Sequence, residues 1–287
     1  MIAKPLWLRR PMAASGRITA TRRALKESGV GTVCESANCP NLCECFDKGV
    51  ATFIILGDIC TRGCRFCAVG CIEPRPGNLL PPDPSEPENI YNAVTRLGLK
   101  YAVITSVTRD DIPDGGAAHF SDVVSYVKAR APGVGIEVLV PDFRGLEASI
   151  RTAHGPGVDV FAHNIDTVRR LYGKVKPKAD YDVSLSVLRI SSRLFPLTPV
   201  KSGLMLGLGE TEREVSSAME DLRGAGCSVL TLGQYLKPSG SRIEEAEFVP
   251  PKMFAKYREM AYNCGFARVS SGPFVRSSYH AACLNNR

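Results

Sequence analysis

The chain of 287 residues is 44% hydrophobic and 23% charged, proportions that are ordinary for a globular protein. It is long enough to bury one barrel-sized core or two smaller ones. No apolar run approaches the ~20 residues that a membrane-spanning helix needs, and the N-terminus lacks the apolar core of a secretory signal peptide. The formal net charge of +7 suggests a weak preference for acidic partners, but no nucleic-acid-binding motif accompanies it. We therefore expect neither a membrane nor a nucleic acid as a partner.

Eight of the eleven cysteines lie before residue 72, and six of these form two sets of three. The first set has the spacing C-x4-C-x5-C, and the second has the spacing C-x3-C-x2-C. The sets are Cys34, Cys39 and Cys45, and Cys60, Cys64 and Cys67. Such clustering in a long chain favours metal ligands in a reducing compartment over disulfides. Three thiolates can hold three irons of a [4Fe–4S] cube and leave the fourth iron open to a substrate or cofactor.

Two other interpretations of the cysteines fit their spacing less well. Structural zinc prefers four ligands in C-x2-C pairs, and only one such pair occurs here. Cys71 could complete a four-thiolate cluster of ferredoxin type, but the first gap is longer than in the bacterial ferredoxin pattern and Ile72 replaces its proline. Cys71 and Cys43 stay unassigned, and an exchange of Cys43 for Cys45 as a ligand stays open.

The pattern along the chain after residue 50 is strand followed by helix, repeated. Apolar runs rich in β-formers predict strands at 52–56, 101–105, 135–140, 158–161, 203–206 and 229–232. Helical periodicity occurs at 88–97, 117–129, 210–223 and 253–263. Gly224 and Gly265 are expected to end the last two helices, and the proline-rich stretch 73–87 is expected to be a loop. Nearly continuous apolar strands that alternate with helices predict a parallel sheet covered by helices, either open or closed into a barrel.

Polar or glycine-rich residues follow each predicted strand. In parallel α/β folds function collects at the carboxyl ends of the strands, so we expect one shared site there. His163 and Asn164 follow the fourth strand, and His163 could be an acid–base group or a structural histidine. The glycines Gly207 and Gly209 follow the fifth strand but lack the full dinucleotide-binding pattern.

Several motifs carry a resemblance to a known family. The C-x3-C-x2-C run, with Phe66 before its last cysteine, resembles the signature of radical S-adenosylmethionine (SAM) enzymes. The C-x4-C-x5-C set and the closing sequence Arg-Ser-Ser-Tyr at 276–279 resemble the lipoyl synthase family within that superfamily. Matching stretches at 105–117, 137–145, 201–211 and 230–239 extend the resemblance over almost the whole chain.

The resemblance implies an α/β fold with a partial (β/α)6 barrel of radical SAM type. It divides the chain into an N-terminal extension with the auxiliary cysteines (1–50), the barrel (51–265) and a C-terminal segment that closes the barrel (266–287). It also implies that the basic N-terminus belongs to the folded enzyme, so that an organellar transit peptide is the less favoured interpretation and a cytoplasmic protein is expected.

The resemblance further implies the chemistry of the site. Cys60, Cys64 and Cys67 would hold the cluster that cleaves SAM to methionine and a 5′-deoxyadenosyl radical. Cys34, Cys39 and Cys45 would hold an auxiliary [4Fe–4S] cluster that gives up sulfur, with Ser278 on its fourth iron and Ser277 as the fallback. Without the resemblance, the two serines would be interpreted as a helix cap before 279–284. Contacts to SAM are expected from Phe66, Thr105, Glu137, Asn164, Gly207 and Gly209.

The substrate implied is an octanoyl group on a lysine of a carrier domain, which would receive sulfur at C6 and C8. The carriers expected are the E2 components of 2-oxoacid dehydrogenases and the glycine cleavage H protein. The electron donor expected is a protein such as ferredoxin or flavodoxin. Two alternatives are a radical SAM enzyme of another kind, such as a methylthiotransferase, and a non-catalytic iron–sulfur electron carrier.

Overall fold

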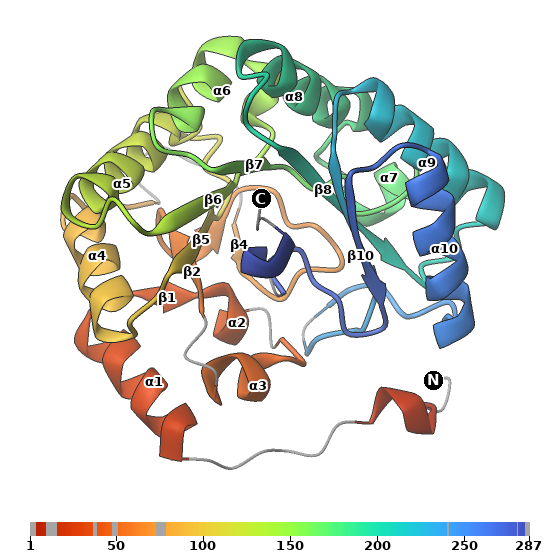
Figure 1. Cartoon of the computed structure of the whole chain (residues 1–287), viewed down its shortest axis with the longest axis horizontal. Coiled ribbons are helices and arrows are strands. Elements are labelled where there is room, and N and C mark those ends of the chain that lie inside the picture. Colours follow the sequence, from red (N-terminus) through yellow and green to blue (C-terminus); the bar gives the residue numbers. More distant parts are fainter. Residues whose placement is uncertain are drawn as a thin grey trace.

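The computed structural model describes residues 4–9, 16–36, 39–47, 51–72, 79–239, 241–279 and 281–284. Its main sheet has the order β1-β2-β5-β6-β7-β8-β9-β10. Figure 1 shows these strands curving around an interior, with the larger helices on the outside and the C-terminal segment reaching into the open side. The architecture is a partial barrel of the α/β class, as predicted.

The strands of the main sheet are parallel, except that β1 pairs with β2 in the antiparallel sense. Their bounds are β1 Gly31–Thr32, β2 Thr52–Ile55, β5 Tyr101–Ser106, β6 Gly135–Leu139, β7 Val160–Ala162, β8 Val200–Leu206, β9 Val229–Gln234 and β10 Arg268–Gly272. A second, small sheet pairs β3 Ile59–Cys60 with β4 Gly70–Cys71.

The longer helices alternate with the strands and cover the sheet. The α-helices are α1 Gly16–Glu27, α2 Val33–Ser36, α3 Leu42–Asp47, α4 Glu86–Arg96, α5 Ala117–Arg130, α6 Glu147–His154, α7 Tyr172–Val175, α8 Tyr181–Leu194, α9 Glu212–Gly224 and α10 Pro251–Asn263. The short 3-10 helices are η1 Leu6–Leu8, η2 Phe143–Gly145, η3 Arg169–Leu171 and η4 Ala281–Leu284. Among the described residues, no helix combines the length and the apolarity needed to cross a bilayer.

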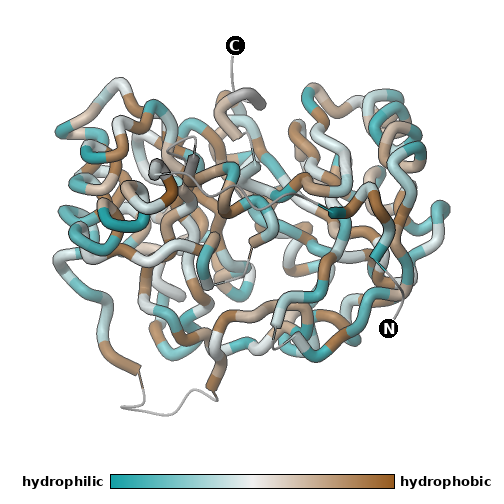
Figure 2. Tube along the Cα trace, turned by 90° about the horizontal axis from the view of Figure 1, so that it is seen from below, coloured by the Kyte–Doolittle hydropathy of each residue, from teal (hydrophilic) through white to brown (hydrophobic). Residues whose placement is uncertain are grey.

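Local sequence signals explain several of these helices. Thr211 and Glu214 form a capping box at the start of α9, and the side chain of Asp180 caps α8. The face of α5 that includes Phe120 and Val123 is fully buried against the sheet. Burial of each such side chain stabilises the fold by roughly 1.5–3 kcal/mol. Hydrophilic and hydrophobic residues alternate along the outer helices, as expected of helices that bury one face (Figure 2).

All six predicted strands are present, with shifts of a few residues at the ends of β7 and β8. Strands β1 and β10 were not predicted, because β1 has two residues and β10 contains serines and a glycine in place of an apolar run. The glycine in the left-handed conformation after α9 is Gly226 (φ +82°), two residues beyond the predicted Gly224. Gly265 ends α10 as predicted, with φ +94°.

A buried ion pair lies inside the barrel, towards the amino ends of the strands. Phe161 of β7 stacks on His154 of the outer helix α6, so its neighbours Val160 and Ala162 face the interior. Their sheet partners are Glu137 and Lys201, which therefore also face inward.

Lys201 Nζ lies 2.8 Å from Glu137 Oε1, and both side chains are 1% exposed. The Tyr101 hydroxyl donates to Glu137 Oε2 at 3.2 Å. Burial and the neighbouring carboxylate raise the pKa of Tyr101, so its hydroxyl keeps the proton that it donates. Glu137, Lys201 and Tyr101 therefore form one polar cluster inside the barrel.

Replacing Lys201 with Met leaves the Glu137 carboxylate buried without a cation. We expect the free energy of unfolding to fall by about 3–5 kcal/mol, measured by urea denaturation followed by circular dichroism. The double substitution Lys201→Met with Glu137→Gln should recover much of the loss, because no buried charge remains. A single variant as stable as the unsubstituted chain would contradict this role of the pair.

Candidate active site

The second cysteine set begins at Cys60, the last residue of β3, and continues in the loop that leads to β4. The backbone N–H of Arg62 donates to Cys60 Sγ and that of Val69 to Cys67 Sγ, each at 3.4 Å. Gly63 turns the loop with φ +66°, and a Cβ at this position would lie only 3.1 Å from Cys71 Sγ. The loop therefore presents three partly buried thiols in a fixed arrangement, and all three line one cavity.

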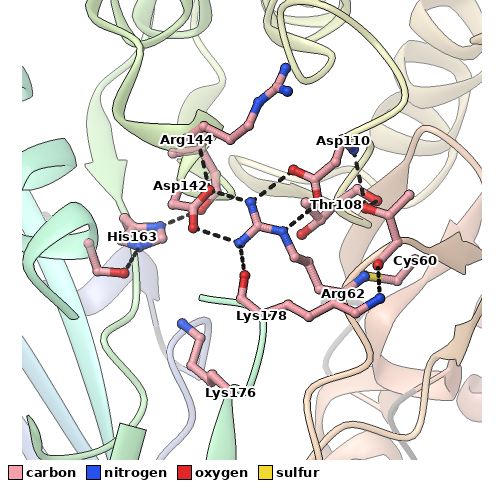
Figure 3. A network of polar contacts seen from close by, with 12 residues as sticks. Cys60, Arg62, Thr108, Asp110, Asp142, Arg144, His163, Lys176 and Lys178 are labelled. Carbon is pink, nitrogen blue, oxygen red and sulfur yellow. Dashed lines mark hydrogen bonds and ion pairs between the residues drawn. The ribbon is translucent and has the colours of Figure 1, made fainter. Parts of the chain in front are cut away.

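The guanidinium of Arg62 holds this loop against two strand ends. Figure 3 shows it between Asp110, after β5, and Asp142, after β6. Its contacts to Asp110 are 2.5 and 2.8 Å long, and both of its contacts to Asp142 are 2.9 Å. Burial alone would raise the pKa of Asp142, but the charge and hydrogen bonds of Arg62 hold it below its usual range. The cysteine loop is thus anchored by a largely buried, bidentate ion-pair network.

The first cavity, here called the cysteine-loop cavity, has a volume of about 240 Å³. Besides the three thiols, it is lined at strand ends by Thr105 and Asn164, and by the ion pair Lys176–Asp166 (2.9 Å). Burial disfavours the ammonium, but Asp166 raises the pKa of Lys176 above its usual range, so the lysine stays charged. This cavity therefore offers a buried cation and carboxylate beside the thiols.

His163 also lines this cavity, but both of its ring nitrogens are occupied. Nδ1 lies 2.8 Å from the Val140 carbonyl oxygen, and Nε2 lies 3.0 Å from Ser184 Oγ. Burial, together with the nearby charge of Lys176, lowers the pKa of His163. The geometry therefore favours the structural interpretation of this histidine over the acid–base one.

A second cavity of about 260 Å³, the apolar cavity, adjoins the first and shares Phe66, Cys67 and Asn164 with it. It is bordered by cysteines of both sets, since Cys34 and Cys39 also line it. Most of the remaining wall is apolar, from Leu139, Leu204, Met205, Tyr235, Leu236, Pro238 and Val275.

A small third recess gathers the first cysteine set. It is lined by Cys34, Cys39 and Cys45 from the N-terminal extension and by Ser278 from the far end of the chain. Ser277 lines the apolar cavity instead. We call it the N-terminal cysteine recess.

Hydrogen bonds join the two parts of the chain that form this recess. Asn41 Nδ2 donates to the Phe274 carbonyl oxygen at 2.7 Å. The hydroxyl of Tyr279 donates to the Glu44 carboxylate at 2.9 and 3.0 Å. The N-terminal extension and the C-terminal segment are therefore packed together at this recess.

The two unassigned cysteines lie outside the cavities described above. Cys43 packs against the hydrophobic core, so the geometry favours Cys45 over Cys43 at the recess. Cys71 Sγ accepts a hydrogen bond from Arg242 Nη2 at 2.9 Å.

The donor sets suit iron–sulfur clusters. Each set offers three soft thiols around a cavity, the ligand type and number that leave one iron of a cube open. Among the described residues, no three His, Cys, Asp or Glu side chains are grouped so that they could hold a single metal ion. Burial raises the pKa of Cys64 to about 12 and those of Cys34 and Cys67 to about 11. These thiols would become thiolates only by passing their protons to solvent as a metal centre binds.

Of the six residues predicted to contact SAM, the structure brings Phe66, Thr105 and Asn164 to the cavities. Glu137 does not line these cavities, and its carboxylate is paired with Lys201 inside the barrel.

The two predicted glycines also lie away from the cavity walls described above. The amides of Gly207 and Leu208 donate to the Glu210 carboxylate, at 2.5 and 2.9 Å. A Cβ on Gly207 would lie 2.3 Å from Gln234 Nε2, so the glycine is required for close packing.

The sequence reasoning missed the roles of Arg62, Asp166 and Lys176. Arg62 stands inside the cysteine run, and Asp166 comes two residues after a predicted strand-end residue, so both carried a weak signal. Lys176 follows α7, far from any predicted strand end, and nothing in its neighbourhood marked it.

Comparisons with known proteins agree with this geometry. The model of the radical SAM superfamily matches residues 54–222. The chain is 51% identical to a lipoyl synthase of Caldanaerobacter subterraneus subsp. tengcongensis, covering 98% of this chain and 96% of that protein. It is 51% identical to a lipoyl synthase of Pyrobaculum calidifontis (96% and 94% covered) and 48% identical to one of Methylobacillus flagellatus (97% and 84% covered).

Solved structures resemble the fold at low sequence identity. Methylornithine synthase (PylB) superposes with a TM-score of 0.55 at 15% identity, covering 79% of this chain and 72% of that one. The [FeFe]-hydrogenase maturase HydG gives a TM-score of 0.51 at 15% identity, with 96% and 72% covered. These likenesses concern the fold alone.

Replacing Arg62 with Ala releases the cysteine loop from Asp110 and Asp142. We expect a chelator to remove iron from the reconstituted protein about ten- to a hundredfold faster, since groups that orient metal ligands contribute on this scale. The rate is measured anaerobically with a coloured iron chelator. Arg65→Ala, an exposed position in the same loop, is the matched control and should behave as the unsubstituted protein. Equal rates for both variants would count against the anchoring role of Arg62.

Proposed function

The chain belongs to the lipoyl synthase family of the radical SAM superfamily, and from this premise we propose how its residues carry out the family's reaction. The reaction inserts two sulfur atoms, at C6 and C8, into an octanoyl group held on a carrier lysine. The cofactors are two [4Fe–4S] clusters and SAM. We assign one cluster to Cys60, Cys64 and Cys67, and the auxiliary cluster to Cys34, Cys39, Cys45 and Ser278.

One observation supports this assignment: the apolar cavity is lined by cysteines of both sets, Cys67 from one and Cys34 and Cys39 from the other. When bound, SAM with its cluster supplies a 5′-deoxyadenosyl radical, and the auxiliary cluster supplies sulfur. An octanoyl C–H bond is not acidic, so a general base would achieve nothing there. The contribution of the protein is to hold the chain between the two centres and to keep water away.

The cysteine-loop cavity has the groups that SAM requires. The buried ammonium of Lys176 matches a carboxylate, and Asp166 beside it can accept hydrogen bonds from ribose hydroxyls. Phe66, Thr105 and Asn164 add the remaining wall. The apolar cavity next to it, with Leu204, Met205 and Leu236 on its wall, suits the octanoyl chain.

For partners we propose the octanoylated carriers expected above, the E2 domains and the glycine cleavage H protein, with reduction by ferredoxin or flavodoxin. We propose the cytoplasm as the compartment. Cys60, Cys64 and Cys67 form no disulfide, and cluster thiols need reducing surroundings.

The function is tested by incubating the reconstituted protein anaerobically with SAM, a reductant and an octanoyl-lysyl peptide. We expect 5′-deoxyadenosine and a peptide that has gained two sulfurs, both measured by mass spectrometry. Deoxyadenosine without sulfur gain would favour another radical SAM reaction, and neither product would favour an electron carrier.

Lys176→Met removes the buried cation and keeps most of the side-chain volume. We expect the dissociation constant for SAM to rise at least tenfold, because a charge-assisted hydrogen bond contributes roughly 1.5–3 kcal/mol. Equilibrium dialysis with labelled SAM measures it, and Lys176→Arg, which keeps the charge, should retain most of the affinity. Unchanged affinity in Lys176→Met would remove this lysine from the SAM site.

Ser278→Cys replaces a hard oxygen donor with a thiolate. We expect slower sulfur insertion with continued formation of 5′-deoxyadenosine, since a thiolate should be harder to displace from iron. The ratio of inserted sulfur to deoxyadenosine in a single turnover measures the effect. Ser271→Cys, on β10, is the control and should keep the normal ratio. Normal insertion by Ser278→Cys would contradict the idea that an easily displaced ligand helps the cluster to release sulfur.

A further inference from the structure

Asn164 stands where the two large cavities meet. It follows β7 at the carboxyl end of the sheet, and its half-buried side chain lines both the cysteine-loop cavity and the apolar cavity. Asn164 is therefore one of the residues that a ligand in either cavity would meet.

The side chain of Asn164 has a hydrogen-bond partner in the C-terminal segment. The hydroxyl of Ser277 donates to Asn164 Oδ1 at 3.1 Å, across 113 positions in the sequence. Ser277 directly precedes Ser278, which lines the N-terminal cysteine recess. A single hydrogen bond thus links the wall of the SAM site to the residue before the proposed iron ligand.

Close packing at two glycines surrounds the Ser277–Asn164 hydrogen bond. A Cβ at Gly203 of β8 would lie 2.8 Å from Asn164 Oδ1, so the amide is pressed against the strand behind it. A Cβ at Gly233 of β9 would lie 2.0 Å from the Val275 carbonyl oxygen, so the C-terminal segment is pressed against the next strand. The amide is thus packed against β8 and the segment against β9, and close packing of this kind transmits small displacements.

The segment is also held at both of its ends. Phe274 accepts from Asn41, and Tyr279 donates to Glu44, so both ends are tied to the extension that carries the first cysteine set. Between these ties, Ser277 provides a side-chain hydrogen bond to the barrel strands.

We propose that the Asn164–Ser277 hydrogen bond couples occupancy of the SAM cavity to the placement of Ser278 at the N-terminal cysteine recess. The inference rests on the proposed function, and it makes Ser277 a positioning residue. SAM that packs against Asn164 fixes the amide in the orientation that holds Ser277, and the segment is then held more tightly. Coupling of this kind is reciprocal, so losing the hydrogen bond must also weaken SAM binding.

The test uses the reconstituted holoenzyme and two readouts besides turnover. Hydrogen exchange measured by mass spectrometry follows the peptides that span 273–279, with and without SAM. Equilibrium dialysis gives the dissociation constant for SAM. In the unsubstituted protein we expect SAM to slow exchange across this segment.

In Ser277→Ala we expect that slowing to disappear and the dissociation constant to rise roughly three- to tenfold, the range of a single hydrogen bond. Ser277→Thr keeps the hydroxyl and should restore both properties. Gly203→Ala, which crowds the Asn164 amide and the Thr231 hydroxyl, should also abolish the effect of SAM on exchange.

Ser271→Ala is the matched control, because its hydroxyl donates to the Phe254 carbonyl oxygen at 2.7 Å and not to Asn164. It should keep both the SAM affinity and the exchange response. A Ser277→Ala protein that retains both would overturn the coupling, even if the unsubstituted enzyme inserts sulfur normally. An unsubstituted enzyme that forms no deoxyadenosine would instead overturn the proposed function.

Discussion

The proposed site depends on bringing cysteines of both sets to the wall of one apolar cavity. An unactivated C–H bond gives an acid or base nothing to act on, so the acyl chain must lie within reach of both the radical source and the sulfur source. We propose that the apolar cavity, which Cys67, Cys34 and Cys39 all line, meets this constraint. The Arg62 network serves it by fixing the cysteine loop to two strand ends.

The chain ends are joined for the same reason. The N-terminal extension contributes three thiols, and the C-terminal segment contributes Ser278. The hydrogen bonds from Asn41 to Phe274 and from Tyr279 to Glu44 hold the two together, although more than 230 positions separate the partners in sequence. Away from these cavities, the Glu137–Lys201 ion pair is buried inside the barrel.

Features that depend on neighbours in the sequence could be predicted, and contacts between distant residues could not. Cysteine spacing and apolar periodicity depend on neighbours in the chain, so both thiol sets and six strands could be predicted. Lys176 and the Ser277–Asn164 hydrogen bond depend on tertiary contacts that no spacing reports. Glu137, which the resemblance suggested as a SAM contact, is paired with a lysine two strands away, and no local pattern reports that pairing. Strand β10 was missed because its partner β9, and not its composition, makes it a strand.

The most direct measurement is the iron and acid-labile sulfide content of the anaerobically reconstituted protein, taken with both cysteine sets intact and with each set replaced by alanine. The two-cluster account predicts about eight iron and eight sulfide per chain for the intact protein and about four of each for either alanine variant. About four of each in the intact protein, with no further loss when Cys34, Cys39 and Cys45 are replaced, would contradict it.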